Sequence, residues 1–212
     1  MEKKKSEIKR AISVTNLLNY NPRTMDFKGK WLDSFGRPEL GGCWIIWGAS
    51  GNGKTRLALQ LAKYMTAFGR VVYNSLEEGL SLSFKRAVID SGIVSVKNRF
   101  TMLDKEPIEE LIKRLEARKS ADIIFIDSIQ YSGLNKDTAK KLVDSHRSKL
   151  FVFVSHAEGS NPSGRTAKSI RFHSDVELFV TGFRIPEPVS RFKEGGCSPF
   201  VIWEEGAENY EI

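Results

Sequence analysis

The segment from residue 43 to residue 68 constrains the fold of this chain most strongly. Cys43–Trp47 is a short apolar run, which is typical of a strand buried on both faces. Residues 48–55 read Gly-Ala-Ser-Gly-Asn-Gly-Lys-Thr and match the pattern G-x-x-x-x-G-K-[ST]. Thr55–Phe68 then repeats apolar side chains at helical spacing. A strand, a glycine-rich turn and an amphipathic helix in this order predict a phosphate-binding loop in an α/β protein.

The residue types in the loop suit the binding of MgATP. Glycines let backbone N–H groups turn inward around phosphate oxygens, and the start of the helix adds a favourable dipole. Lys54 is expected to reach the β- and γ-phosphates, and the Thr55 hydroxyl is expected to bind Mg²⁺. The predicted nucleotide contacts are Gly48, Ala49, Ser50, Gly51, Asn52, Gly53, Lys54, Thr55 and Arg56. The alternative is a strand-to-helix turn with no ligand, which the flanking strand and helix disfavour.

Two other segments place carboxylates where a sheet of this kind binds ligands. Asp122–Asp127 reads as a buried strand that ends in Asp127, which we expect to hold Mg²⁺ through water rather than only to cap the next turn. Glu77 and Glu78 follow the strand predicted at Val71–Leu76. Either glutamate could be a surface turn residue, but we expect one of them to orient the attacking water.

The rest of the chain alternates between strand and helix patterns. Helices are expected at Leu82–Asp90, Pro107–Lys119 and Lys136–Ser148, and further strands at Phe100–Leu103, Leu150–Ser155, Val176–Phe183 and Pro199–Glu205. This alternation predicts a mainly parallel central sheet with helices on both faces, and the last two strands are expected to form a C-terminal antiparallel extension. Residues 1–40 are expected to form a basic, partly irregular N-terminal segment, and residues 41–212 a single core.

Charge and hydropathy narrow the partners and the location. The formal net charge is +7, and residues 1–30 hold eight Lys and Arg against three Asp and Glu. This surplus suits a polyanionic partner such as nucleic acid, although a solvated basic surface would give the same count. No apolar run approaches the roughly 20 residues that span a bilayer, the first residues do not form a secretory signal, and Cys43 and Cys197 fit no metal-ligand pattern. A cytoplasmic location and no membrane partner are expected.

Together these motifs resemble the RecA-like P-loop ATPases, especially the branch with the bacterial RadA recombination factor, KaiC-type ATPases and DnaB-type helicases. The similar segments are Gly48–Thr55 (Walker A), Asn74–Glu78, Ile124–Gln130 (Walker B) and Val154–His156. The resemblance implies that Glu77 activates water, that Asp127 is the acid on the magnesium side, and that Ser155 and His156 sense the γ-phosphate; His156 also reads as a simple turn residue. It further implies that the strand Leu150–Ser155 lies between the Walker A and Walker B strands.

The same resemblance suggests how the chain contacts DNA and its own copies. Glu158–His173 falls where the family places a DNA-contacting loop, and it carries Arg165, Lys168 and Arg171. Ser190–Phe192 is similar to part of a RadA motif that acts across a subunit boundary. Arg191, Arg171 and Lys168 are therefore candidates for a cation supplied in trans, and a homo-oligomer is expected, as a ring or a filament.

Two functions of different classes remain open. The leading interpretation is a Mg²⁺-dependent ATPase that acts on single-stranded DNA in recombination or replication, alongside other proteins of those processes and with a layout like that of compact phage-encoded RecA-core proteins. The alternative is a nucleotide-switched assembly or loader module, similar to KaiC, whose partner is a protein. A small-molecule kinase is disfavoured by the paired Glu77 and Glu78 and by the lack of an obvious lid.

Overall fold

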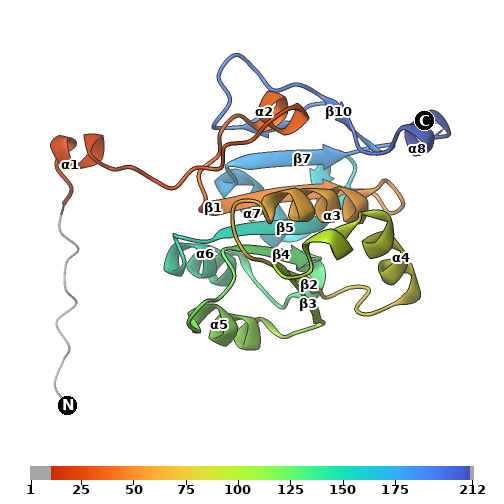
Figure 1. The fold of residues 1–212 in the computed structure, drawn as a ribbon, viewed down its shortest axis with the longest axis horizontal. Helices are drawn as coiled ribbons and strands as arrows, with labels where there is room; N and C mark the ends of the chain where they lie inside the picture. The colour runs from red at the N-terminus through yellow and green to blue at the C-terminus, as the bar shows by residue number, and fades with distance from the viewer. Residues whose placement is uncertain (1–10, 211–212) are drawn as a thin grey trace.

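The computed structural model describes residues 11–210, which form a twisted sheet covered by helices on both faces (Figure 1). The strands are β1 (Gly42–Gly48), β2 (Val71–Ser75), β3 (Phe100–Asp104), β4 (Ile123–Asp127), β5 (Leu150–Glu158), β6 (Asn161–Pro162), β7 (Val176–Val180), β8 (Arg184–Ile185), β9 (Val189–Ser190) and β10 (Phe200–Val201). The α-helices are α1 (Val14–Leu18), α2 (Lys30–Phe35), α3 (Lys54–Met65), α4 (Leu82–Asp90), α5 (Ile108–Glu116), α6 (Lys136–Ser145), α7 (Gly164–His173) and α8 (Glu204–Glu208). Two short 3-10 helices, η1 (Ile93–Val96) and η2 (Ile129–Tyr131), lie between them.

The main sheet has the order β3-β2-β4-β5-β1-β7-β9, and β6 pairs with β5. Strands β1 to β5 and β7 run parallel along this path. The predicted α/β class with a mainly parallel sheet is therefore confirmed, and so is the position of the Leu150–Ser155 segment between the strands that end in Gly48 and Asp127.

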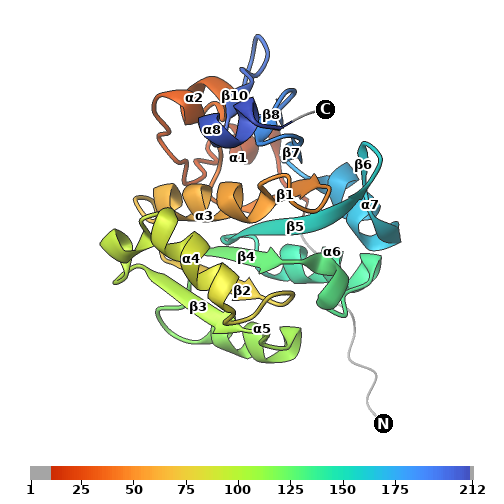
Figure 2. The ribbon, with the colours of Figure 1, turned by 90° about the vertical axis from the view of Figure 1, so that its right-hand side faces the viewer.

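Alternate side chains of the central strands enter two separate hydrophobic cores. On β1, Trp44 and Ile46 pack with Leu57 of α3 on one face of the sheet. Cys43, Ile45 and Trp47 of β1 pack on the other face with residues of α5, α6 and α7, such as Leu111. Successive side chains of a strand point to opposite faces, so a strand covered on both sides needs an unbroken apolar run. The two helical layers are visible in Figure 2.

The C-terminal strands are arranged differently from the predicted antiparallel extension. Strand β7 is parallel to β1, with Trp44 opposite Val176, and only β9 pairs with β7 in the antiparallel direction. The predicted strand at Pro199–Glu205 is reduced to β10, which pairs with β8 outside the main sheet, and is followed by α8. Helix α7 stands where a loop is expected from the sequence, and it supplies the long crossover that a parallel strand needs.

The segment before β1 contributes to the core of the sheet domain. Met25, Phe27 and Phe35 are fully buried in the same cluster as the apolar face of α3. Helix α1 has no buried residue, and an extended segment of the chain without regular structure holds it away from the sheet (Figure 1). Among the described residues, no helix has the length and apolar character needed to cross a membrane.

Candidate functional site

The carboxyl ends of the central parallel strands bring the predicted site residues together. The register places Ser75 beside Asp127 and Gly48 beside His156. The loop after β1, the turn after β2, the end of β4 and the end of β5 therefore meet at one edge, which is where open α/β sheets bind ligands. A pocket of about 280 Å³ at this edge is lined by Ser50, Gly51, Gly53, Lys54, Thr55, Arg56, Glu77, Glu78, Asp127 and Phe183.

The loop between β1 and α3 has the geometry of an anion cradle. Gly53, which precedes α3, has a φ of 99°, and a Cβ there would lie 2.6 Å from the Phe183 ring, so glycine is required. In the described part of the chain, no hydrogen bond within the protein uses the N–H groups of Gly51, Gly53, Lys54 or Thr55. Unpaired N–H groups at the start of a twelve-residue helix are suited to bind phosphate oxygens.

The loop is held in place from the C-terminal part of the chain. The Asn52 Oδ1 atom accepts a hydrogen bond of 2.7 Å from the N–H of Gly182, and the N–H of Phe183 donates to the Asn52 carbonyl at 3.1 Å. Asn52 is buried, so it acts as a support of the loop rather than as part of the pocket lining. The loop pattern predicts a nucleotide contact at Asn52, whereas its side chain supports the loop, and Phe183 reaches the loop only because the folded chain brings residues 182–183 to it.

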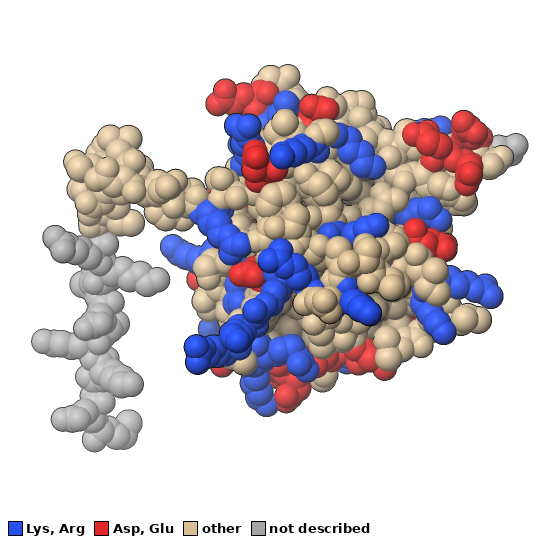
Figure 3. Space-filling view, viewed as in Figure 1, with Lys and Arg blue, Asp and Glu red and all other residues tan. Residues whose placement is uncertain are grey.

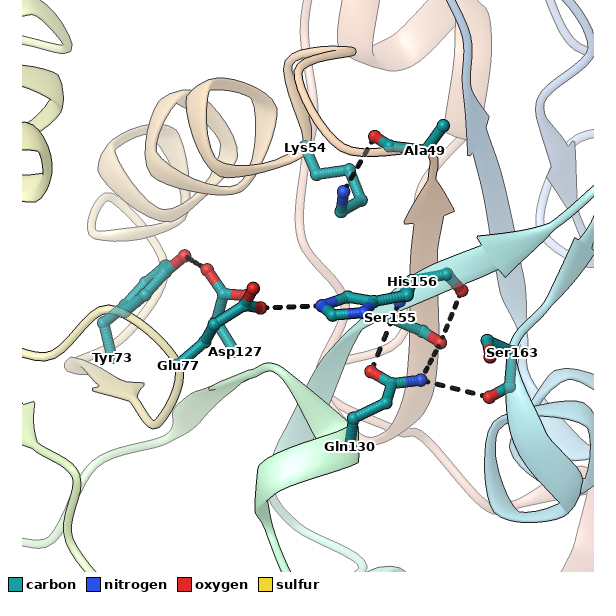
Figure 4. A network of polar contacts seen from close by, with 9 residues as sticks. All are labelled: Ala49, Lys54, Tyr73, Glu77, Asp127, Gln130, Ser155, His156 and Ser163. Atoms are coloured by element: carbon teal, nitrogen blue, oxygen red, sulfur yellow. Dashed lines mark hydrogen bonds and ion pairs between the residues drawn. The ribbon is translucent and has the colours of Figure 1, made fainter.

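Lys54 and Thr55 begin helix α3 and face the pocket. The Lys54 Nζ atom donates a hydrogen bond of 2.9 Å to the Ala49 carbonyl (Figure 4). Burial lowers the pKa of Lys54, and the nearby carboxylates of Asp127 and Glu77 oppose that shift. A cation between a phosphate cradle and two acidic groups is positioned to bind a polyphosphate.

Asp127 is a buried carboxylate at the end of β4. Burial raises its pKa to about 6, while the hydrogen bond that the Tyr73 hydroxyl donates to it and the charge of Lys54 lower it. The charges of Glu77 and Glu78 raise it further. Tyr73 had not been predicted, because its place on buried strand β2, stacked on Phe125, gives it the pattern of a core residue.

These residues fit a hydrated Mg²⁺ ion bound together with phosphate. Thr55 and Asp127 line the same pocket, and they supply the hydroxyl and carboxylate oxygens that the ion prefers. Among residues 11–210 there is no group of three or more His, Cys, Asp and Glu that could hold a metal ion alone. Mg²⁺ is usually held by one or two carboxylates and by substrate phosphates, so the donor set agrees with a nucleotide-bound ion.

The two adjacent glutamates have different surroundings. Oε2 of Glu77 lies 2.8 Å from Nε2 of His156. Burial would raise the pKa of Glu77, but the hydrogen bond and charge of His156, with smaller effects of Ser128 and Lys54, outweigh it and lower that pKa. Glu78 instead accepts hydrogen bonds from the hydroxyls of Ser81 at 3.3 Å and Ser83 at 2.9 Å. Glu77 therefore stays an ionised carboxylate beside Lys54 and Asp127, whereas Glu78 is tied to the start of α4.

A network of hydrogen bonds surrounds the predicted sensor residues at the end of β5 (Figure 4). The Ser155 hydroxyl accepts a hydrogen bond of 2.8 Å from Gln130, and the N–H of His156 donates to the Gln130 side-chain oxygen at 3.3 Å. Gln130 also donates to the Ser163 carbonyl at 3.0 Å. The sequence pattern marks Gln130 only as the end of a motif, because its partners lie 25 to 33 residues away in the chain.

The expected DNA-contacting loop at Glu158–His173 is mostly helix. Ala167 and Ile170 pack against the sheet, and this apolar pair three residues apart favours α7 over a loop. Arg165 and Lys168 are exposed on it, and Lys168 forms an ion pair of 3.0 Å with Glu158.

Arg171 does not share the exposed face of α7. Its guanidinium donates a hydrogen bond of 2.7 Å to Glu177 and lies over the ring of Trp47. Phe172, which had not been predicted, has 82% of its surface exposed. The three expected cations therefore have different surroundings: Arg165 and Lys168 are exposed on α7, whereas Arg171 is engaged by Glu177 and Trp47. The aromatic side chain of Phe172 lies on the same helix.

Arg191 lies at the amino ends of the central strands, whereas the pocket lies at their carboxyl ends. It follows β9, whose Ser190 pairs with Val176 at the start of β7. The Arg191 guanidinium contacts Asp175 at 3.3 Å, and Asp175 in turn accepts a hydrogen bond from the N–H of Cys43 at the start of β1. Within one chain, Arg191 is thus separated from the phosphate loop by the length of β1.

No protein-family model matches the chain, and no curated protein matches it. The function is therefore inferred from the geometry of the pocket. Its parts are a row of unpaired N–H groups, the lysine Lys54, a hydroxyl and a buried carboxylate, and the ionised Glu77. This set can bind a polyphosphate with a divalent cation and can hold a water molecule beside a base.

Proposed function

We propose that the chain is a RecA-like P-loop ATPase that binds MgATP, hydrolyses it and acts on single-stranded DNA in recombination or replication. The observation that carries the proposal is the meeting of Lys54, Asp127 and Glu77 in one pocket beside a loop of unpaired N–H groups. Three separate segments of the chain supply these groups, and a turn without a ligand would have no need of all of them.

The loop and Lys54 bind the phosphates of ATP. Backbone N–H groups and the positive end of α3 stabilise negative oxygens, and Lys54 leaves its contact with the Ala49 carbonyl to pair with the β- and γ-phosphates. Thr55 and Asp127 would hold Mg²⁺, which supplies neutralisation of the phosphate charge when it is bound. The buried position of Asp127 makes its charge effective, because water does not screen it.

Glu77 is the base of the hydrolysis step. A water oxygen forms a bond to the γ-phosphorus as the bond from that phosphorus to the bridging oxygen breaks, and the bridging oxygen leaves with the electron pair on ADP. Glu77 accepts the proton of the water and later returns it to the released phosphate. Its Oε2 atom is engaged by His156, so Oε1 is the atom available to the water.

Helix α7 supports an action on single-stranded DNA. Arg165, Lys168 and Phe172 follow one another at spacings of three and four residues, which places them on one face of the helix. Exposed cations bind the phosphates of a strand, and an exposed aromatic ring stacks on its unpaired bases. The formal net charge of +7 acts in the same direction. Blue Lys and Arg side chains are spread over the face of the molecule drawn in Figure 3.

A homo-oligomer with ATP at the subunit boundary completes the proposal. Lys54 and Arg56 are the cations that line the pocket among the described residues, and Arg56 is stacked at 4.3 Å on the ring of Trp203. A neighbouring subunit is proposed to supply a further cation, and Arg191 at the far edge of the sheet suits a head-to-tail assembly. Lys168 and Arg171 remain the other candidates.

Measuring the ATPase rate with and without single-stranded DNA tests this function. Strong stimulation by DNA is expected, and a complete lack of ATP hydrolysis would overturn the proposal. The second candidate, an assembly module that binds a protein, is favoured by the exposed apolar side chains of Val14, Leu17 and Leu18 on α1. ATP hydrolysis that ignores DNA would support this second candidate.

A further inference from the structure

His156 has a backbone that is fixed on several sides and a side chain that reaches Glu77. Its N–H donates to Gln130, and its carbonyl accepts hydrogen bonds from the Ser155 hydroxyl at 2.9 Å and from the N–H of Ser163 at 2.8 Å. The imidazole then extends across the edge of the sheet to the Glu77 carboxylate (Figure 4). A donor anchored in this way can define the orientation of its acceptor.

Glu77 needs such a contact because its position leaves the side chain free to change rotamer. Its side chain is 38% exposed and follows the end of β2. A glutamate side chain in water samples many rotamers, whereas a base in hydrolysis has to hold one. The bond from His156 fixes Oε2 and leaves Oε1 free to meet a water molecule.

Gln130 connects this pair to helix α7. Its side-chain nitrogen donates to the Ser163 carbonyl, its side-chain oxygen accepts from the N–H of His156, and Ser163 directly precedes the first residue of α7. Ser163 and His156 also contact each other through their backbones. A shift of α7 would therefore be transmitted to His156 through two hydrogen-bonded routes.

We propose that His156 is a positioning residue that orients Glu77, and that Gln130 couples this orientation to α7, so that a single strand bound on α7 changes the rate of hydrolysis. The proposal rests on the proposed ATPase function. It assigns His156 to the base rather than to the γ-phosphate, which is where the resemblance had placed it.

Enzyme kinetics tests the role of His156. His156→Ala is expected to lower kcat by about tenfold to a hundredfold, the scale of a misplaced catalytic group, and to leave KM for ATP unchanged. His156→Gln keeps an N–H donor and is expected to recover part of the loss. Adding His156→Ala to Glu77→Gln is expected to cause no further loss, because both changes remove the same interaction. His146→Ala is the matched control, since His146 packs against Phe151 away from the pocket.

NMR of the imidazole nitrogens gives a readout that does not depend on activity. The chain has three histidines, so each can be assigned by substitution. Glu77→Gln is expected to shift the His156 signals and to leave those of His146 and His173 in place. A short oligothymidine is expected to shift His156 in the wild type but not in Gln130→Ala, and the matched control is Gln60→Ala, because Gln60 bonds instead to the Ile202 carbonyl.

The outcomes separate this inference from the proposed function. Wild-type protein without ATPase activity would overturn both. Active wild type, inactive Glu77→Gln and fully active His156→Ala would overturn the inference alone. His156 signals that are unchanged by Glu77→Gln would also overturn it, and an oligothymidine shift that persists in Gln130→Ala would refute the coupling to α7.

Discussion

The imidazole of His156 lies 2.8 Å from the carboxylate of Glu77, although 79 residues separate them in the chain. The sheet order explains the contact, because only β4 lies between β2, which precedes Glu77, and β5, which carries His156. Asp127 ends that intervening strand. The three residues therefore mark adjacent strand ends, and changes at each of them have distinguishable effects.

Replacing Lys54 should abolish ATP hydrolysis while the fold stays intact. Lys54→Ala removes the cation that reaches from the phosphate loop into the pocket, and among residues 11–210 the Lys54 side chain donates only to the Ala49 carbonyl. ATPase assays and circular dichroism are the measurements. Lys63→Ala, in the last turn of the same helix, is the control and should keep normal turnover. Near-normal turnover by folded Lys54→Ala would refute the site assignment.

Glu77 and Glu78 should respond very differently to the same substitution. Glu77→Gln is expected to keep ATP affinity and to lose at least about a hundredfold in turnover, the usual scale for a lost general base. Glu78→Gln should retain most of its activity, because the Glu78 carboxylate is bonded to Ser81 and Ser83. Nucleotide titration and steady-state rates are the measurements. The reverse result would show that Glu78 is the base.

The parts of the site that the sequence predicted are those encoded in short segments. The phosphate loop, Asp127 and the Glu77–Glu78 pair each follow directly on an apolar run, and strand ends in a parallel sheet share one edge. Tyr73 and Gln130 were missed as site residues because their roles depend on contacts that only the sheet order creates. Whether the chain uses these groups on ATP and DNA stays a prediction.

Helix α7 could not be predicted from the sequence for a different reason. Its apolar positions, Ala167 and Ile170, are few, and polar residues surround them, so the segment reads as a loop. Helices in proteins gain most of their stability from tertiary packing, and Ala167 and Ile170 supply such packing for α7. The same packing turns Arg171 toward Glu177 and leaves Phe172 exposed, which no pattern in the segment had indicated.

Removing the charge of Asp127 should stabilise the fold at neutral pH. The folded-state pKa of about 6 exceeds the ordinary value of 3.8, so the folded chain binds a proton more readily, and its stability falls as pH rises through this window. Above pH 6 the Asp127 charge then lowers the free energy of unfolding by on the order of 3 kcal/mol, from about two pKa units at 1.4 kcal/mol each. Asp127→Asn should unfold at a higher temperature than the wild type at pH 7.5, and the difference should vanish near pH 4.

The exposed Asp144 provides a control, because its pKa is shifted in the opposite direction from that of Asp127. Its pKa is lowered, chiefly by the hydrogen bond with Lys140, so its ionised form favours the folded state. Asp144→Asn should therefore give no stabilisation at pH 7.5. Thermal unfolding in metal-free buffer is the measurement for both variants. A lower melting temperature for Asp127→Asn at pH 7.5 would contradict the assignment of a costly buried charge.

Single-stranded DNA should be held by charge and by stacking on α7. Arg165→Ala with Lys168→Ala should flatten the slope of log affinity against log salt by about 1.4, or about 0.7 per lost phosphate contact. Phe172→Ala should weaken binding by about 1–3 kcal/mol without a change of slope, because stacking releases no counterions. Fluorescence anisotropy at several salt concentrations is the measurement. Lys140→Ala with Lys141→Ala on α6 is the matched control, and an unchanged slope in the α7 variant would show that this face does not touch DNA.

Arg191 offers the sharpest test of a shared active site. In one chain it lies at the amino ends of β1 and β7, bonded to Asp175, whereas the phosphate loop lies at their carboxyl ends. A cation in that place can act on ATP only in a neighbouring subunit, and such a cation is worth about a thousandfold or more in related phosphoryl-transfer sites. Arg191→Ala alone should therefore lose most turnover while keeping ATP binding.

Mixing two inactive variants separates an action in trans from a structural role of Arg191. Subunits with Lys54→Ala keep a working arginine, and subunits with Arg191→Ala keep a working phosphate loop. At some boundaries of a mixed head-to-tail assembly, an intact loop then meets an intact arginine, and part of the activity should return. Arg37→Ala, which breaks a comparable surface ion pair with Asp26, should stay active without mixing. No recovery in verified mixed oligomers would remove Arg191 from the site, and full activity of a strict monomer would remove the need for any residue in trans.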